Sequence, residues 1–313
     1  MKRLKHLFDF PVYLLAAGGL KLLGIIPRRT AYALTTCLAK WFYWILPAYR
    51  KVILTNLGIA MPDLSKKKAR DIVLSTFSNI GRVAIELGRV PKLKDKSPQE
   101  LSGLFILPTD VENQIRRLLA RGKGLLYLTG HFGVWELLPN VHACILPDIP
   151  LSIVVRPLDN PGMDRLVNGY RTSLGNRLIP KKNSLRQITE ALGRNEAVGI
   201  LLDQNVCWEE GVFVDFFGRL ACTNFGLAAL ALRTGSPVLP VGLFYDAQVK
   251  LYRVAAAPEI SILRTGKKAE DIRANTALFA KATEAMVREH PDQWLWVHKR
   301  WKTRPKGSTE KIY

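Results

Sequence analysis

The sequence of 313 residues has only four cysteines, and no two of them form a CxxC pair. Scattered thiols of this kind are typical of a reducing compartment, and they exclude a disulfide framework or a cysteine zinc site. An HExxH motif is also absent, so we expect no metal site. The four positions are Cys37, Cys144, Cys207 and Cys222.

Several other catalytic signatures are missing. Without a GxGxxG or Walker A motif, the sequence predicts no nucleotide redox cofactor. Without a GxSxG elbow, a serine hydrolase would have no position for its nucleophile. Internal repeats and low-complexity tracts are absent as well, and an apolar content of 48% excludes a disordered chain.

Acidic residues are also scarce: the sequence has 46 Lys and Arg but only 26 Asp and Glu. The formal net charge is +20, and the sequence pI is about 10.0. A field of this strength favours nucleic acid, an anionic membrane surface, or acidic substrates and carriers as partners.

The N-terminal region contains two apolar stretches. The first runs from Leu7 to Pro27 and is interrupted by Asp9 and Lys21, and the second covers residues 31–47. A bilayer span needs roughly 20 apolar residues, which the first stretch barely reaches. The aromatic cluster at 41–44 fits a membrane interface, and two buried core helices are the alternative. The basic start also allows a signal peptide, although no small-residue cleavage site follows it.

Further along the chain, short apolar strands alternate with helices. Such alternation predicts an α/β fold with a central, mostly parallel sheet flanked by helices. We expect residues 1–60 to form an apolar helical region that associates with a membrane, and residues 61–313 to form the α/β domain. Strands are expected at 125–129, 151–155, 198–202, 211–216, 238–245 and 251–255, and helices at 66–88, 111–121, 163–174, 184–194, 223–234 and 271–290.

The clearest chemical motif is His131-Phe-Gly-Val-Trp-Glu136, which follows a buried strand and Gly130. Within one helix, five positions would separate the two side chains by about 140°. They can meet if His131 lies in a strand-to-helix turn, which Gly130 and Gly133 permit, and Glu136 lies in the first helical turn. The carboxylate would then fix the imidazole tautomer for general base catalysis. The alternative is a surface histidine near a helix start, where Glu136 is favourable through the helix dipole.

Polar residues follow two other strands at the corresponding position. Arg156 ends the strand at 151–155 and suits a phosphate group, although it can also be a solvated loop arginine. Arg171, one helix further on, is a weaker candidate for the same role. Asp203 and Gln204 end the strand at 198–202, at a position analogous to that of His131. Open α/β sheets place their sites beyond these strand ends, so we expect Asp203 and Gln204 to face the same cleft.

The segment from Trp294 to Arg304 alternates aromatic with basic residues. Such a run can bind single-stranded nucleic acid, lie at a membrane headgroup layer, or pack as a structural element. Arg300 within it is a candidate for a substrate phosphate or for an interior ion pair.

Taken together, these motifs resemble the acyltransferase family of lipid A biosynthesis, the late lauroyl and myristoyl transferases. That family belongs to the glycerolipid acyltransferase superfamily, whose first motif is His-X4-Asp/Glu. The resemblance covers about residues 40 to 305, and it departs from the wider superfamily in lacking Pro-Glu-Gly in the third block. It is carried by GKGLLYLTGHFGVWELLP (122–139), RKVILTNL with MP (50–62), GILLDQN (199–205), FVDFFG with ACT (213–223), RTGSPVLPV (233–241) and WLWVHKRWKTRP (294–305).

The resemblance implies a membrane-associated acyltransferase on the cytoplasmic face of a bacterial inner membrane. His131 would be the general base and Glu136 its orienting carboxylate. The substrate-binding residues would be Arg156, Arg171, Asp203, Gln204 and Arg300. The donor would be an acyl carrier protein thioester, or less favourably a coenzyme A thioester, and no cofactor would be needed. The acceptor would be an anionic glycolipid, and nucleic acid would not be a partner.

Two alternatives remain open from the sequence. The same chemistry can serve another acceptor, such as a phosphatidylinositol mannoside, a lysophospholipid or another membrane lipid. A non-enzymatic alternative is a basic nucleic-acid-binding protein, which would show strongly salt-dependent binding.

Overall fold

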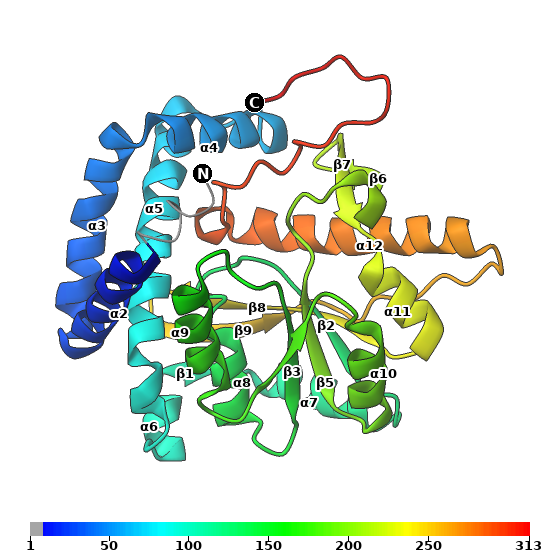
Figure 1. The fold of residues 1–313 in the computed structure, drawn as a ribbon, viewed down its shortest axis with the longest axis horizontal. Coiled ribbons are helices and arrows are strands. Elements are labelled where there is room, and N and C mark those ends of the chain that lie inside the picture. The colour runs from blue at the N-terminus through cyan, green and yellow to red at the C-terminus, as the bar shows by residue number, and fades with distance from the viewer. Residues whose placement is uncertain (1–8) are drawn as a thin grey trace.

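The structure, a computed structural model, describes residues 9–313, which form a central β-sheet with helices on both faces (Figure 1). The strand order in this sheet is β1-β9-β8-β2-β5-β3-β4. All neighbours are parallel except β8 and β9, so the predicted α/β fold with a mostly parallel sheet is confirmed. The strands are β1 Phe105–Ile106, β2 Leu125–Thr129, β3 Leu151–Val155, β4 Arg177–Pro180, β5 Ala197–Leu201, β8 Val238–Asp246 and β9 Leu251–Ala256.

The central strand β2 divides the core into two layers, because successive side chains of a strand point to opposite faces. Leu125 and Tyr127 pack with one set of helices, and Leu126 and Leu128 pack with the other. The first set contains α7 Thr109–Leu119, α8 Leu138–Ile145 and α9 Pro161–Thr172, and the second contains α10 Leu185–Gly193, α11 Gly226–Thr234 and α12 Lys268–Glu289. All five residues of β2 are buried, as expected for a strand covered on both faces.

The N-terminal helices pack against the long helix α5 at one side of the sheet (Figure 1). A Cβ atom on Gly24 would lie 2.4 Å from the Gly88 carbonyl oxygen, so only glycine allows α2 and α5 to cross this closely. Beside this crossing the buried Glu86 carboxylate accepts hydrogen bonds from Arg28 and Tyr32. The elements here are α2 Asp9–Ile25, α3 Arg28–Ile45, α4 Pro47–Ala60, α5 Lys66–Arg89, η1 Val90–Leu93 and α6 Pro98–Ser102.

The outer surface of these helices is rich in exposed apolar side chains. Leu15 is 77% exposed, Trp41 67% and Trp44 69%. No helix within residues 9–313 combines the length and the apolar character that crossing a bilayer requires.

A two-stranded hairpin of β6 Gly211–Phe216 and β7 Arg219–Asn224 stands apart from the main sheet. Its turn residues, Phe217 and Gly218, both have positive φ, as a tight hairpin turn requires. The strand predicted at 211–216 is therefore confirmed. The helix predicted from Thr223 begins only at Gly226, because Thr223 pairs with Val212 in the hairpin.

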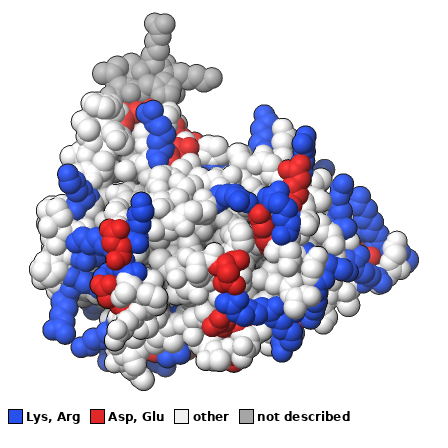
Figure 2. Space-filling model, turned by 90° about the horizontal axis from the view of Figure 1, so that it is seen from below, with Lys and Arg blue, Asp and Glu red and all other residues white. Residues whose placement is uncertain are grey.

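Figure 2 shows Lys and Arg side chains in several groups, mainly toward the two sides of the visible face, with smaller groups of Asp and Glu beside them. On this face the basic side chains thus form several groups rather than one continuous stripe.

Candidate active site

The register of two neighbouring strands brings His131 and Asp203 together. Thr129 at the end of β2 pairs with Leu201 at the end of β5. His131 and Asp203 each follow two residues after these partners, so both lie at the carboxyl edge of the parallel sheet. This edge is where open α/β sheets bind ligands, and the expectation that Asp203 faces the cleft of His131 is met.

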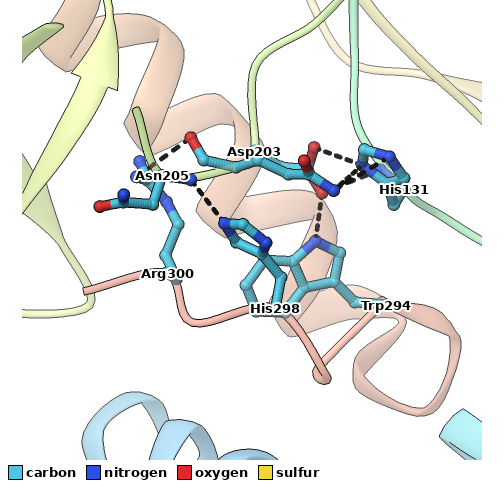
Figure 3. Close-up of polar contacts among 7 residues, drawn as sticks. His131, Asp203, Asn205, Trp294, His298 and Arg300 are labelled. Carbon is cyan, nitrogen blue, oxygen red and sulfur yellow. Dashed lines mark hydrogen bonds and ion pairs between the residues drawn. The ribbon is translucent and has the colours of Figure 1, made fainter. Parts of the chain in front are cut away.

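Asp203 accepts three hydrogen bonds that define the geometry of the pair (Figure 3). The first carboxylate oxygen, Oδ1, lies 2.8 Å from His131 Nδ1. The second, Oδ2, accepts from the His131 backbone N–H at 2.9 Å and from Trp294 Nε1 at 2.8 Å. Because an ionised carboxylate only accepts, Nδ1 carries the ring proton and Nε2 keeps its lone pair.

The electrostatics of the pair favour an imidazolium ion. Burial lowers the pKa of His131, but the charge of Asp203, its hydrogen bond and the charge of Glu136 outweigh burial and raise this pKa above its usual value. Burial raises the pKa of Asp203, but the hydrogen bonds and charge of His131, with Trp294, hold it well below its usual range. The pair is therefore arranged to receive a proton on Nε2 while Asp203 stays ionised.

Glu136 binds Arg171 rather than His131. The two carboxylate oxygens accept from Arg171 Nη2 at 2.7 Å and from Nε at 2.8 Å, and both side chains are less than one-fifth exposed. No hydrogen bond joins Glu136 to His131 within residues 9–313, so we correct the orienting carboxylate of His131 to Asp203. The nearby charge of Glu136 is one of the causes that raise the pKa of His131.

The backbone explains why Glu136 points elsewhere. Residues 133–137 form turns, and α8 begins only at Leu138, so Glu136 does not lie in a first helical turn as predicted. The Gly133 N–H donates to the Gln293 carbonyl, and the Val134 N–H donates to the Leu243 carbonyl. These two N–H groups therefore bind distant segments of the chain instead of forming the start of a helix. Gly133 has a φ of 49°, and a Cβ atom there would lie 2.0 Å from the Leu243 oxygen. Only glycine fits this turn.

Two further side chains flank the imidazole. Gln204 Nε2 lies 3.2 Å from His131 Nε2 and 3.5 Å from Nδ1. With the ring proton on Nδ1, the Gln204 amide is the donor and His131 Nε2 the acceptor of the shorter contact. Trp135 meets the ring edge to face, with 5.2 Å between the ring centroids.

The C-terminal aromatic run is a packed structural element. Trp294, Trp296 and Trp301 are each at most 2% exposed, so they cannot stack on bases or lie among headgroups. The run holds the segment after Asp203, because His298 Nε2 accepts from the Asn205 backbone N–H at 2.9 Å (Figure 3). Burial lowers the pKa of His298 to about 4, which keeps this acceptor neutral.

Arg300 is buried beneath the site and is 1% exposed. Its guanidinium donates to the Cys222 carbonyl at 2.9 Å and to Thr223 Oγ1 at 2.5 Å, and its Cζ lies 4.8 Å from the centroid of Phe216. Burial lowers the pKa of Arg300 to about 10. Because no face of the side chain is open to a substrate, we correct its predicted substrate-binding role to one in holding the β6–β7 hairpin.

Arg156 lies beyond the end of β3, on the same edge of the sheet as His131. Its side chain is exposed and makes no hydrogen bond or ion pair within residues 9–313. The structure thus leaves this guanidinium available to solvent, as a phosphate-binding residue requires.

An apolar cavity of about 60 Å³ lies between β2 and α8. Trp135 both lines this cavity and contacts the His131 ring, so the cavity adjoins the His131–Asp203 pair. A long hydrocarbon chain needs the lining side chains to move apart. The other lining residues are Leu107, Ile115, Tyr127, Thr129, Leu138, Pro139, His142, Ile145, Leu146, Leu151, Ile153, Gly199, Leu201, Val241 and Val254.

Sequence reasoning missed the roles of Trp294 and Trp135. Trp294 is 91 positions from the carboxylate that it binds, and no local pattern marks such a contact. Trp135 lies inside the His131–Glu136 motif, where an aromatic next to a candidate base was an available signal. In the part of the chain that the structure describes, no three His, Cys, Asp or Glu side chains gather as a metal-binding group.

Comparison with known proteins gives one consistent result. Residues 1–303 match the family described as bacterial lipid A biosynthesis acyltransferase. The chain is 26% identical to the lipid A biosynthesis lauroyltransferase of Escherichia coli over 297 residues, which are 94% of this chain and 92% of that protein. It is 26% identical to the E. coli lipid A biosynthesis palmitoleoyltransferase over 259 residues, covering 81% and 79%. It is 24% identical to a phosphatidylinositol mannoside acyltransferase of Mycobacterium tuberculosis over 267 residues, covering 80% and 76%.

Proposed function

Because the chain belongs to the family of bacterial lipid A biosynthesis acyltransferases, we propose that it transfers a fatty acyl chain from an acyl carrier protein thioester to a hydroxyl of a lipid A-type glycolipid. The observation that carries this proposal is the His131–Asp203 pair beside an apolar cavity. A base whose Nε2 lone pair is met by the Gln204 amide, which an acceptor hydroxyl would displace, suits the attack of a hydroxyl on an acyl thioester beside an apolar cavity.

In the proposed reaction, His131 Nε2 takes the proton of the acceptor hydroxyl as its oxygen attacks the thioester carbonyl carbon. The new ester C–O bond forms, the C–S bond breaks, and the imidazolium returns its proton to the leaving thiolate. Asp203 holds the ring through Nδ1 and stabilises the imidazolium charge. Glu136 adds a second negative charge nearby. The enzyme forms no covalent intermediate.

The basic side chains at this edge of the sheet are proposed to bind the polar parts of the substrates. Arg156 is exposed and unpaired within residues 9–313, so it can bind a phosphate of the glycolipid bidentately. Arg171 is held by Glu136, and its guanidinium lies close enough to the imidazole to act against the rise in the pKa of His131. Gln204 lies within hydrogen-bond distance of His131 Nε2, so its amide would also reach an oxygen bound there.

The exposed apolar side chains of α2 and α3 support attachment to the cytoplasmic face of a bacterial inner membrane. Leu15, Trp41 and Trp44 would enter the interface, where aromatic side chains are favoured. The net charge of +20 would attract an acidic carrier protein, an anionic glycolipid and an anionic leaflet.

The direct test is transfer by the purified protein from an acyl carrier protein thioester to a lipid A precursor. His131→Ala should abolish transfer, and Glu136→Ala should reduce it. Glu190→Ala is the matched control and should leave transfer unchanged, because within residues 9–313 this carboxylate forms an ion pair only with the exposed Arg186. Undiminished transfer by His131→Ala would refute the mechanism.

A second acceptor is favoured by the similarity to phosphatidylinositol mannoside acyltransferases. The same assay with a phosphatidylinositol mannoside in place of the lipid A precursor separates the two acceptors. Mass spectrometry of the product identifies which hydroxyl is acylated.

A further inference from the structure

The cavity beside His131 is apolar except for three polar side chains. These are Tyr127 and Thr129 on β2 and His142 on α8. Tyr127 and Thr129 lie two residues apart on the strand, so both face the same layer of helices. The ring of Tyr127 contacts that of His142 edge to face, with 5.6 Å between centroids.

The two hydroxyl groups have no hydrogen-bond partner. Tyr127 is 5% exposed and Thr129 is 7% exposed, yet neither Tyr127 Oη nor Thr129 Oγ1 meets a donor or acceptor within residues 9–313. A buried hydroxyl without a partner costs free energy that a Phe or Val of the same shape would not cost. A purely hydrocarbon ligand would leave both groups unsatisfied.

His142 is the third polar side chain that lines the cavity. Its Nε2 lies 2.9 Å from the Ile149 carbonyl oxygen, so Nε2 carries the proton and Nδ1 keeps a lone pair. Burial lowers the pKa of His142 to about 4, which keeps the ring neutral at physiological pH. The cavity is therefore lined by two side chains with unpartnered hydroxyl groups and by one neutral imidazole, among apolar walls.

We propose that this cavity selects an acyl chain that bears a hydroxyl group near its thioester end, with Tyr127 and Thr129 as the residues that recognise the oxygen. The proposal rests on the acyl transfer proposed above and names its donor more closely. Thr129 lies two residues before His131, and Tyr127 lies about 7 Å further along the strand. Because Thr129 is the nearer of the two to His131 along the strand, we expect the recognised oxygen toward the thioester end of the chain.

The test compares dodecanoyl and 3-hydroxydodecanoyl carrier-protein thioesters as donors to one lipid A precursor. The wild type should show kcat/KM about tenfold higher for the hydroxylated donor, as one net hydrogen bond predicts. Tyr127→Phe and Thr129→Val should each reduce this ratio toward one while retaining transfer of the plain dodecanoyl group. Tyr49→Phe changes a tyrosine that is 52% exposed on α4 and is the matched control.

A binding measurement separates the selectivity from the chemistry. Free 3-hydroxydodecanoate should raise the Tm of the wild type more than dodecanoate does, and Tyr127→Phe should remove this difference. Equal transfer of both donors by the wild type, or a ratio unchanged by Tyr127→Phe, would overturn the proposed selectivity and leave the acyltransferase function intact. Absence of transfer with either donor would instead count against the acceptor or donor class proposed above.

Discussion

Asp203→Asn separates the two carboxylates near His131 by their effect on the imidazole tautomer. Asp203 Oδ2 accepts from two fixed donors, the His131 backbone N–H and Trp294 Nε1. In the variant the amide oxygen must take this place, because an NH₂ group there would meet two donors. The NH₂ group then faces His131 Nδ1, which has to accept, and the ring proton moves to Nε2. The base loses the lone pair that the reaction needs.

The expected magnitude follows from this change of tautomer. A wrong tautomer in a base–acid pair of this kind lowers kcat by about ten-thousand-fold, which is about 5 kcal/mol of transition-state stabilisation. Glu136→Gln keeps one acceptor oxygen for Arg171 and removes only a nearby charge, so its loss should be about tenfold to a hundredfold. The assay is steady-state transfer with an acyl carrier protein thioester, supported by ¹⁵N NMR of the imidazole tautomer.

The pH dependence provides an independent readout of the same pair. His131 must be neutral to act as a base, and Asp203 helps to raise its pKa, so wild-type kcat/KM should increase with pH through a value above about 6.5. Removing the Asp203 charge lowers this pKa, and the residual activity of Asp203→Asn should persist to lower pH. Retention of more than about a tenth of wild-type kcat by Asp203→Asn, or an unmoved acidic limb, would refute the assignment.

Other substitutions test the elements that build the site. Trp294→Phe removes one donor to Asp203, and we expect a loss of about 1–3 kcal/mol in the free energy of unfolding, measured with urea, together with lower kcat. Gly133→Ala places a Cβ atom against the Leu243 oxygen at positive φ and should cost more than about 3 kcal/mol, whereas Gly169→Ala, with open space around its position, should be nearly neutral in the same measurement. Arg156→Ala should raise KM for a phosphorylated acceptor while Tm stays unchanged, and an unchanged KM would remove Arg156 from the acceptor site.

The protein's own sequence determined the fold class and the position of the site. The buried run at β2 and the residues that follow it are local signals, because the alternation of strands and helices is visible within short windows. His131 and Asp203 each stand just past a strand, so their placement at one edge of a parallel sheet followed from the order of elements alone. The family blocks were recognisable for the same reason, since each is a short contiguous segment.

Tertiary structure decided which groups meet at that edge. The pairing of Thr129 with Leu201 set Asp203 against the imidazole. Glu136 is closer to His131 in the sequence than Asp203 is, but its carboxylate forms an ion pair with Arg171, which is 35 positions away. Arg300, a candidate phosphate ligand from the sequence, is buried and donates a hydrogen bond to the Cys222 carbonyl in the interior. These outcomes depend on contacts between distant segments and on the competition of buried groups for partners, which local spacing does not encode.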